Sequence, residues 1–218
     1  MGPCLLLDVD GVILRDRLLL SHVKHNATRY VKKKLPGCED PAATNRVLYM
    51  AHGHTATGLR KSFGMDVSDY NDEVYDKSLM MHLADVLEGD QFVRDAELVH
   101  GLSAKGWEVT LFSNAPHKWV EPVALGINDQ IKVRCPGPDM NTAILKPDEE
   151  FYMNFDTCLG YYYVDDSLKN LGAVRRFANW RAIHFTEAEK EQWLWCPQVR
   201  SLEELSLSLG SLWASSVR

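Results

Sequence analysis

Two aspartates stand directly after a short apolar run near the start of the sequence. The run is Cys4–Leu7, and it is followed by Asp8 and Asp10, with Gly11 behind them. Such a run is typical of a buried strand in a parallel sheet, and ligands bind beyond the carboxyl ends of these strands. One carboxylate could act there as a nucleophile or metal ligand and the other as a proton donor. The alternative is an ordinary acidic turn, which Gly11 allows to be sharp.

Two further polar groups follow later in the chain. Ser113 and Asn114 come directly after the apolar run W-E-V-T-L-F, and Lys146 precedes Pro147 before a predicted helix. A hydroxyl with the free amides of the following turn can hold phosphate oxygens, and a lysine fixed by a proline can present an ammonium to an anion. The alternatives are a helix cap with a turn for the serine pair and a solvated surface lysine for Lys146.

A second pair of carboxylates ends the run Y-Y-Y-V. Asp165 and Asp166 are adjacent, so their charges repel if both lie at a buried strand end. A cation would relieve this repulsion, and Mg²⁺ with oxygen ligands is the natural candidate. The alternative is a helix that begins with an acidic first turn.

The order and spacing of these four segments resemble the four motifs of the haloacid dehalogenase-like hydrolase superfamily. The matching segments are L-L-L-D-V-D-G-V, L-F-S-N, L-K-P-D and Y-V-D-D-S-L-K-N-L. The resemblance covers essentially the whole chain. It implies an α/β fold with a Rossmann-like parallel sheet core and an inserted all-helical cap domain.

The resemblance implies catalytic roles for Asp8, Asp10 and Lys146. Asp8 would be the nucleophile that takes the phosphoryl group. Asp10 would protonate the leaving alcohol and later activate water. Lys146 would neutralise charge between the phosphate and Asp8, because a carboxylate that attacks a phosphate dianion meets repulsion.

The resemblance also implies binding residues. Ser113, with Asn114 beside it, would bind the phosphate together with Lys146. Mg²⁺ would be held by Asp8, the backbone carbonyl of Asp10, and Asp166, with Asp165 assisting. Asn170 stands where many relatives carry an acid, which we expect to weaken metal affinity more than activity.

These roles predict a Mg²⁺-dependent phosphomonoesterase with an aspartyl-phosphate intermediate. Asp10 favours a phosphatase over a dehalogenase, since the dehalogenases of the superfamily need no proton for a leaving alcohol and lack this residue. The alternatives are a phosphomutase or phosphotransferase of the same fold and a non-catalytic scaffold that binds phosphorylated ligands.

The substrate would be a small phosphorylated metabolite. The forms V-D-D-S-x-x-N and K-P-D resemble the branch of the superfamily that contains pyrimidine 5′-nucleotidases. The first expected substrate is therefore a nucleoside 5′-monophosphate, and the second is a sugar or polyol phosphate.

Two histidines in the predicted cap are candidate substrate contacts. His52 and His54 flank Gly53 in an otherwise helical segment, where two imidazoles beside a flexible residue are unexpected for packing alone. The alternative is a pair of surface histidines at a helix end.

The elements that position these residues alternate between strands and helices, which predicts an α/β parallel sheet. About 100 residues separate the first strand from the strand that ends at Phe112, whereas a strand-helix-strand unit needs about 30. We therefore expect residues 1–14 and 90–218 to form the core and residues 15–89 the cap. The predicted helices are 21–35, one from 40, 68–87, 92–105, 115–125, 148–158, 168–178, one near 187 and one from 201; the later strands are 107–112, 131–134, 161–164 and 181–185.

Composition and charge fit this interpretation. The chain has 218 residues, of which 45% are hydrophobic and 25% charged, so disorder is not expected. A net charge of −6 argues against a nucleic-acid partner. No apolar run is long enough to span a bilayer, the start of the sequence does not resemble a signal peptide, and five cysteines form no C-x-x-C pair. We expect a cytoplasmic protein without a membrane partner; the sequence predicts no oligomeric state.

Overall fold

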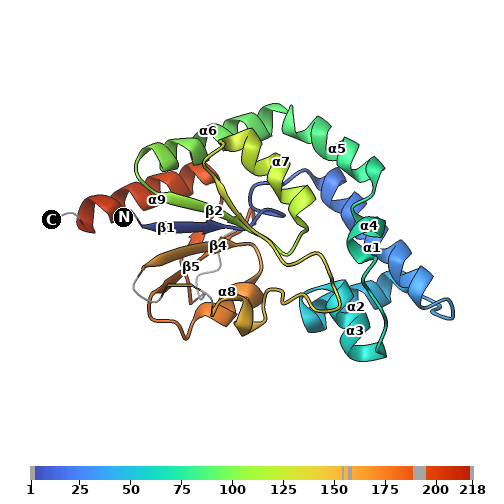
Figure 1. Cartoon of the computed structure of the whole chain (residues 1–218). Coiled ribbons are helices and arrows are strands. Elements are labelled where there is room, and N and C mark those ends of the chain that lie inside the picture. Colours follow the sequence, from blue (N-terminus) through green and yellow to red (C-terminus); the bar gives the residue numbers. More distant parts are fainter. Residues whose placement is uncertain (1–2, 154, 157–158, 189–194, 217–218) are drawn as a thin grey trace.

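The computed structural model describes residues 3–153, 155–156, 159–188 and 195–216. Their centre is a six-stranded sheet in the order β3-β2-β1-β4-β5-β6, in which every neighbouring pair is parallel (Figure 1). This is the order of a doubly wound Rossmann sheet, so the predicted α/β core is confirmed. The strands are β1 (Cys4–Leu7), β2 (Glu108–Phe112), β3 (Lys132–Arg134), β4 (Tyr161–Asp165), β5 (Trp180–Phe185) and β6 (Gln198–Val199).

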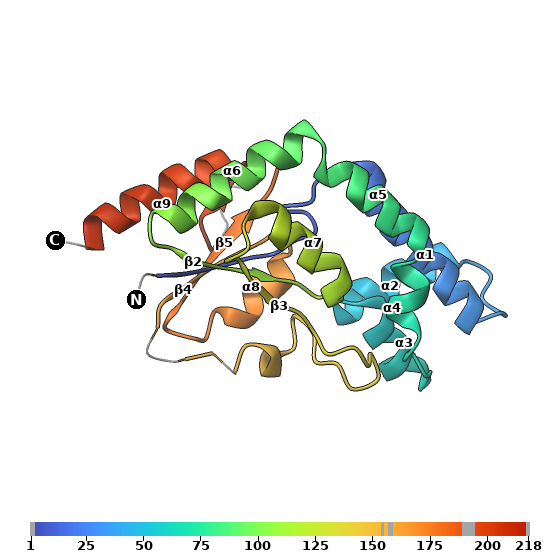
Figure 2. The ribbon, with the colours of Figure 1, turned by 45° about the horizontal axis from the view of Figure 1, so that its top comes forward.

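Helices cover both faces of the sheet. Helices α6 (Asp90–Ala104), α7 (His117–Ile127) and α9 (Leu202–Ser216) lie on one face, and α8 (Leu168–Val174) lies on the other (Figures 1 and 2). Successive residues of β1 point to opposite faces. Leu5 and Leu7 therefore join the core under α6, α7 and α9, whereas Cys4 and Leu6 join a second, aromatic-rich core. Burial on both faces explains why β1 is apolar throughout.

Five helices form the segment between β1 and α6. They are α1 (Arg17–Lys34), α2 (Pro41–His52), α3 (Thr55–Phe63), α4 (Tyr70–Val74) and α5 (Lys77–Leu87). All of residues 15–89 are described, and none of them lies in a strand. Helices α1–α4 lie beyond the carboxyl ends of the strands (Figures 1 and 2). The all-helical insertion is therefore confirmed, while its division from the core at residues 15 and 89 stays a prediction.

Two predicted helices are wrong in length. The helix expected over 68–87 is divided into α4 and α5, because Asp76 caps a new helix by accepting a hydrogen bond from the backbone N–H of Leu79 at 2.9 Å. The helix expected over 148–158 is only a short 3₁₀ turn, η1 (Glu149–Phe151). Residues 154 and 157–158 of that range lie outside the described residues.

Other elements differ less. The sequence pattern did not predict α3 or β6. Glu187 lies in a bend, and residues 189–194 of the helix expected there are outside the described residues. Among the described residues, no helix has both the length and the apolar character needed to cross a membrane.

Candidate active site

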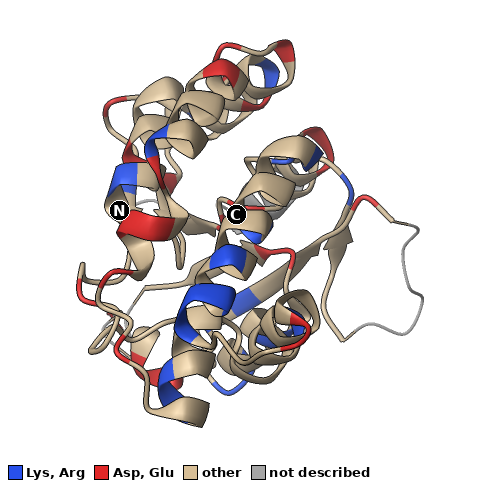
Figure 3. Cartoon of the chain, turned by 90° about the vertical axis from the view of Figure 1, so that its right-hand side faces the viewer, with Lys and Arg blue, Asp and Glu red and all other residues tan. Residues whose placement is uncertain are grey.

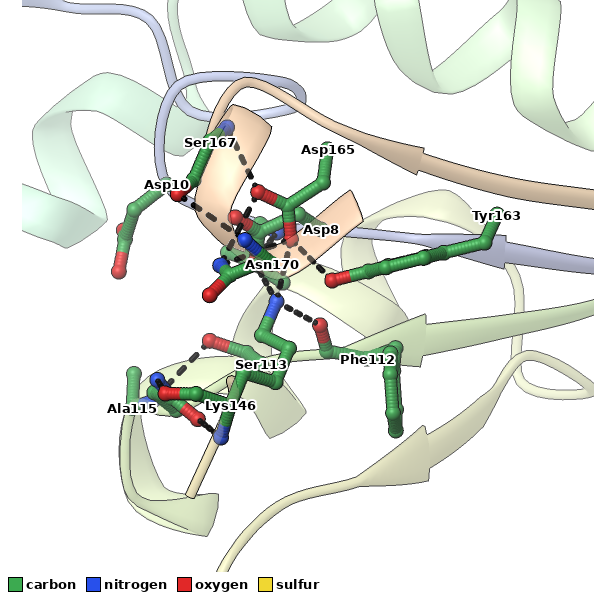
Figure 4. A network of polar contacts seen from close by, with 12 residues as sticks. Asp8, Asp10, Phe112, Ser113, Ala115, Lys146, Tyr163, Asp165, Ser167 and Asn170 are labelled. Atoms are coloured by element: carbon green, nitrogen blue, oxygen red, sulfur yellow. Dashed lines mark hydrogen bonds and ion pairs between the residues drawn. The ribbon is translucent and has the colours of Figure 1, made fainter. Parts of the chain in front are cut away.

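The polar groups that follow β1, β2 and β4 meet at one edge of the sheet (Figure 4). The register pairs Leu7 of β1 with Leu111 of β2 and with Val164 of β4, so these strands end at the same level. Asp8 follows directly, and its backbone N–H donates to the carbonyl of Val164 at 2.9 Å. The parallel pairing thus brings together segments that lie far apart in the sequence.

Lys146 enters this edge from the loop after β3 and is almost fully buried, with 1% of its surface exposed. Its Nζ lies 2.9 Å from Asp8 Oδ1 and 2.8 Å from Asp165 Oδ2, and it donates to the carbonyl oxygen of Phe112 at 2.7 Å. Burial alone would lower the pKa of the ammonium, but the charges of Asp165 and Asp8 outweigh it and raise that pKa above its ordinary value. Lys146 is therefore a fixed positive charge beside Asp8.

Asn114 holds the loop that carries Lys146. Its Nδ2 donates to the backbone carbonyl of Lys146 at 2.9 Å, and its Oδ1 accepts from the backbone N–H of Lys146 at 2.8 Å. Asn114 was expected to bind substrate; it lines the cavity described below, but both ends of its amide are engaged with this loop. Ser113 lines the same cavity, and its Oγ accepts from the backbone N–H of Ala115 at 3.0 Å. The Ser113 hydroxyl proton is left to donate to an anion.

The adjacent carboxylates Asp165 and Asp166 have different surroundings. Asp165 is completely buried and accepts hydrogen bonds from the Tyr163 hydroxyl, the backbone N–H of Ser167 and the Asn170 amide, in addition to the Lys146 contact. Asp166 instead lines the cavity. Burial and then the charge of Asp165 raise the pKa of Asp166 to about 7.

Three carboxylates at this edge fit a divalent cation. Oxygen atoms of Asp8, Asp165 and Asp166 all lie within 4.8 Å of one another. Burial and then the charge of Asp165 raise the pKa of Asp8 well above its usual range, although the ammonium of Lys146 acts in the opposite direction. Gly11 provides the room: it has a φ of +91°, and a Cβ there would lie 2.3 Å from Asp166 Oδ2. Hard oxygen ligands are those that Mg²⁺ prefers.

Asp10 lies apart from this cluster and points away from Asp8 (Figure 4). Its Oδ1 accepts a hydrogen bond from the indole N–H of Trp119 at 3.0 Å. Burial raises the pKa of Asp10 to about 6, although the Trp119 hydrogen bond acts in the opposite direction. A carboxyl group that titrates near neutrality suits proton transfer in both directions. The sequence did not single out Trp119, because an apolar residue in an amphipathic helix is ordinarily interpreted as part of the hydrophobic core.

A cavity of about 400 Å³ lies beside these polar residues at the carboxyl ends of the strands, and its size suits a small-molecule ligand. Its core wall contains Asp8, Asp10, Ser113, Lys146 and Asp166. The inserted helices supply the opposite wall, with Lys24, Asn45, Arg46, Tyr49, His54, Thr55, Tyr70 and Tyr75 among its residues. The cavity thus lies between the expected phosphate site and the inserted helices, whose side of it is called the cap wall.

The two candidate histidines are placed differently. His54 lines the cavity, and its Nδ1 accepts from the backbone N–H of Ala56 at 3.2 Å, which caps α3. Burial lowers the pKa of His54 to about 4, so the ring is neutral near pH 7. His52 lies outside that cavity: its Nε2 is 3.1 Å from Ser62 Oγ, and it lines a separate cavity of about 190 Å³. The structure does not bring the two imidazoles together on one wall.

Sequence reasoning did not single out the cations of the cap wall. These cations are Lys24 on α1 and Arg46 on α2. The helix faces hold the signal that could have found them: α1 lines the cavity with Leu20, Val23, Lys24 and Ala27, and α2 with Asn45, Arg46, Tyr49 and Met50. Both sets follow the three-to-four-residue spacing of one helix face.

Comparison with known proteins agrees with this geometry at the level of fold. No family model matches the sequence, and no curated protein sequence does. The structure of a HAD phosphatase from Thermococcus onnurineus matches with a TM-score of 0.59 and 17% identity, over 96% of this chain and 98% of that one. This chain has the haloacid dehalogenase-like fold. The resemblance expected from the four motifs is confirmed to that extent.

Other haloacid dehalogenase-like structures match over similar lengths. A putative β-phosphoglucomutase from Thermotoga maritima matches with a TM-score of 0.54 and 16% identity, over 96% of this chain and 99% of that one. The L-2-haloacid dehalogenase from Xanthobacter autotrophicus with covalently bound chloropropionic acid matches with a TM-score of 0.52 and 11% identity, over 96% and 99%. Because the fold carries phosphatases, mutases and dehalogenases alike, the choice between them depends on the site.

Proposed function

We propose that this chain is a Mg²⁺-dependent phosphomonoesterase that acts on a small phosphorylated metabolite, with residues 15–89 as the cap over its active site. The observation that supports this most is the position of Lys146, whose ammonium lies between Asp8 and the buried Asp165. This fixed charge stands where a phosphate would meet Asp8, so it offsets the repulsion between the two anions.

The proposed reaction has two steps. An oxygen of Asp8 attacks phosphorus and forms an aspartyl phosphate, the ester P–O bond breaks, and Asp10 gives its proton to the leaving alkoxide oxygen. Asp10 then accepts a proton from water, whose oxygen attacks phosphorus; the aspartyl P–O bond breaks, and inorganic phosphate and free Asp8 result. Ser113 donates to a phosphate oxygen, and Lys146 balances its charge.

Magnesium would be held by Asp8, Asp166 and the backbone carbonyl of Asp10, with Asp165 assisting from behind. When bound, it supplies positive charge that stabilises the phosphoryl oxygens during transfer. Asp165 contributes chiefly by holding Lys146, since its own oxygens already accept from Lys146, Tyr163 and Asn170.

Asp10 favours this reaction over dehalogenation. A leaving alkoxide needs a proton and a leaving halide does not, and Asp10 has a pKa near neutrality through burial. Phosphoryl transfer to a second alcohol, as in a mutase, uses the same residues and is the alternative. Comparing phosphate release with isomerised product for sugar phosphates distinguishes the two.

The decisive experiment replaces Asp8 by Asn and measures phosphate release with Mg²⁺ present from a panel that includes nucleoside 5′-monophosphates and sugar phosphates. We expect turnover by the wild type and at least about a 10³-fold loss in the variant, as for removal of a covalent nucleophile. Chelation of the metal should also abolish turnover. Asp72→Asn is the matched control, because the Asp72 side chain is 87% exposed and contacts only Lys118 among the described ion pairs. An active Asp8→Asn enzyme would overturn the assignment.

A further inference from the structure

The cavity has an uneven distribution of charge between its two walls. The acidic residues that line it are Asp8, Asp10 and Asp166, and all three belong to the core wall. The cap wall contributes two cations, Lys24 from α1 and Arg46 from α2, and no acid. A ligand that touches both walls therefore meets the carboxylates on the core wall and basic side chains on the cap wall.

The two cations lie on helix faces that the cavity wall already uses. Lys24 is one residue after Val23 and one turn before Ala27, which both line the cavity. Arg46 lies beside Asn45 and one turn before Tyr49 and Met50 in the same wall. Helices α1 and α2 pack against each other, so a single rigid pair of helices carries both charges.

Neither cation has an acidic partner. Within the part of the chain that the structure describes, no carboxylate oxygen lies within 4.0 Å of the Lys24 ammonium or the Arg46 guanidinium. Elsewhere on α1, Arg29 lies 3.9 Å from Asp76, and Lys33 lies 3.1 Å from Asp69. Acidic and basic positions are interspersed on this side of the molecule (Figure 3), yet the cavity wall keeps its two cations unpaired.

We infer that the substrate carries a second anionic group, a carboxylate or a further phosphate, on the part that leaves, and that Lys24 and Arg46 bind it. This inference rests on the proposed function for the position of the first phosphate. Arginine offers a planar fork of donors that matches carboxylate or phosphate oxygens, and lysine adds a mobile point charge. A nucleoside 5′-monophosphate, whose leaving nucleoside is uncharged, is then a poorer substrate than a doubly anionic metabolite.

Apart from Lys24 and Arg46, the polar residues of the cap wall are uncharged, and several of them are aromatic. Tyr49, Tyr70 and Tyr75 line it together with Thr55 and Asn45. The Thr55 hydroxyl donates to Asn45 Oδ1 at 2.6 Å, and Asn45 Nδ2 donates to the Thr28 hydroxyl at 3.2 Å, so these polar groups are already satisfied within the cap. Lys24 and Arg46 are the two charged side chains of this wall, and neither has an ion-pair partner among the described residues.

The test compares binding of matched phosphonates, which cannot be hydrolysed. Calorimetry with Mg²⁺ present measures the affinity of the wild type for ω-carboxyalkylphosphonates, α,ω-bisphosphonates and ω-hydroxyalkylphosphonates over a series of chain lengths. We expect the second charge to tighten binding by about tenfold or more at the length that fits, the scale of a charge-assisted hydrogen bond. The carboxylate and bisphosphonate arms show which anionic group is preferred.

Variants separate this contact from general attraction. Lys24→Met and Arg46→Met should each remove most of that preference and leave the hydroxyl compounds within about twofold, since those never make the contact. Lys33→Met is the matched control, because Lys33 is paired with Asp69 and Glu73 and does not line the cavity, and it should retain the full preference. Equal wild-type affinities, or equal losses on all three compounds, would overturn the inference. A protein that keeps the preference but hydrolyses no ester would overturn only the proposed function.

Discussion

At the scale of single residues, the site shows how one position along a chain changes the role of an aspartate. Asp165 is the last residue of β4 and turns inward, where three side chains and a backbone N–H satisfy it. Asp166 is the next residue and faces the cavity. Asp165 therefore anchors Lys146, whereas Asp166 turns its carboxylate to the cavity, where burial and the charge of Asp165 raise its pKa to about 7.

We predict that Lys146→Met destabilises the fold by about 3–5 kcal/mol, because it leaves the buried carboxylates of Asp8 and Asp165 without their counter-ion. Urea denaturation at pH 7 measures this change. Lys33→Met, at a half-exposed ion pair, should change the midpoint little.

The double variant Lys146→Met with Asp165→Asn tests the cause. Removing one of the two buried carboxylate charges that Lys146→Met leaves unpaired should recover part of the lost free energy of unfolding. The double-mutant cycle should therefore give a favourable coupling energy. Additive losses would mean that Lys146 stabilises the core by packing alone.

The residues that could be predicted from the sequence are those next to strand ends. Asp8, Ser113 and Asp166 each follow an apolar run directly, so their placement needs only the local pattern and the rule that parallel strands end together. Lys24 and Arg46 could not be found in this way. The spacing along α1 and α2 shows which residues share a helix face, but it does not show that these faces line a cavity beyond the carboxyl ends of the strands.

At the scale of elements, helix boundaries depend on local capping more than on periodicity. Ser68 to Leu87 reads as one amphipathic helix, but Asp76 accepts from the N–H of Leu79 and begins a second one. Helix α3 was missed for the opposite reason. Its N-cap is His54, an unusual N-cap residue, whereas the ordinary cap residue Thr55 lies inside the first turn of the helix.

The helix N-cap that His54 provides for α3 makes the stability of the fold depend on pH. Burial depresses the pKa of His54 to about 4, and the neutral ring accepts from Ala56. The unfolded chain, with a histidine pKa of about 6.5, then binds more protons, so stability is present above pH 6.5 and is lost as the pH falls towards 4. We expect this group to account for about 3 kcal/mol of that loss.

The measurement is the free energy of unfolding between pH 7 and pH 4 for the wild type and for His54→Asn, which keeps a capping acceptor but does not titrate. As the pH falls, the free energy of unfolding of the wild type should decrease more than that of the variant. Parallel curves would show that His54 is not the titrating group.

At the scale of the whole molecule, contacts between the core and the inserted helices hold the cavity together. Lys169, on α8 of the core, donates to the backbone carbonyls of Met50 and Ala51 at 3.0 and 2.6 Å. These carbonyls belong to the last turn of α2, where a cation also complements the helix dipole. Arg60, on α3, donates to the backbone carbonyl of Asn141 in the loop that follows β3.

The core and the inserted helices also lie close together at Gly53. Its φ of +77° ends α2, and a Cβ there would lie 2.5 Å from Pro147 Cδ. The end of α2 therefore rests on the loop that carries Lys146. Any change in how α2 sits is passed both to this loop and to the cavity wall that contains Arg46 and Tyr49.

We predict that Lys169→Met loosens this arrangement without damaging the core. The side chain is exposed and does not line the cavity, and its hydrogen bonds among the described residues go to Met50 and Ala51. The loss should therefore appear as faster amide hydrogen exchange in α2 and α3, with exchange in β1 and β4 unchanged. The value of kcat/KM should fall by about threefold to tenfold, because the cap wall is no longer held in position. Lys169→Arg, which can still donate to the carbonyls, is the matched control. If exchange rises equally in the strands, Lys169 stabilises the whole fold and not the junction between its two parts.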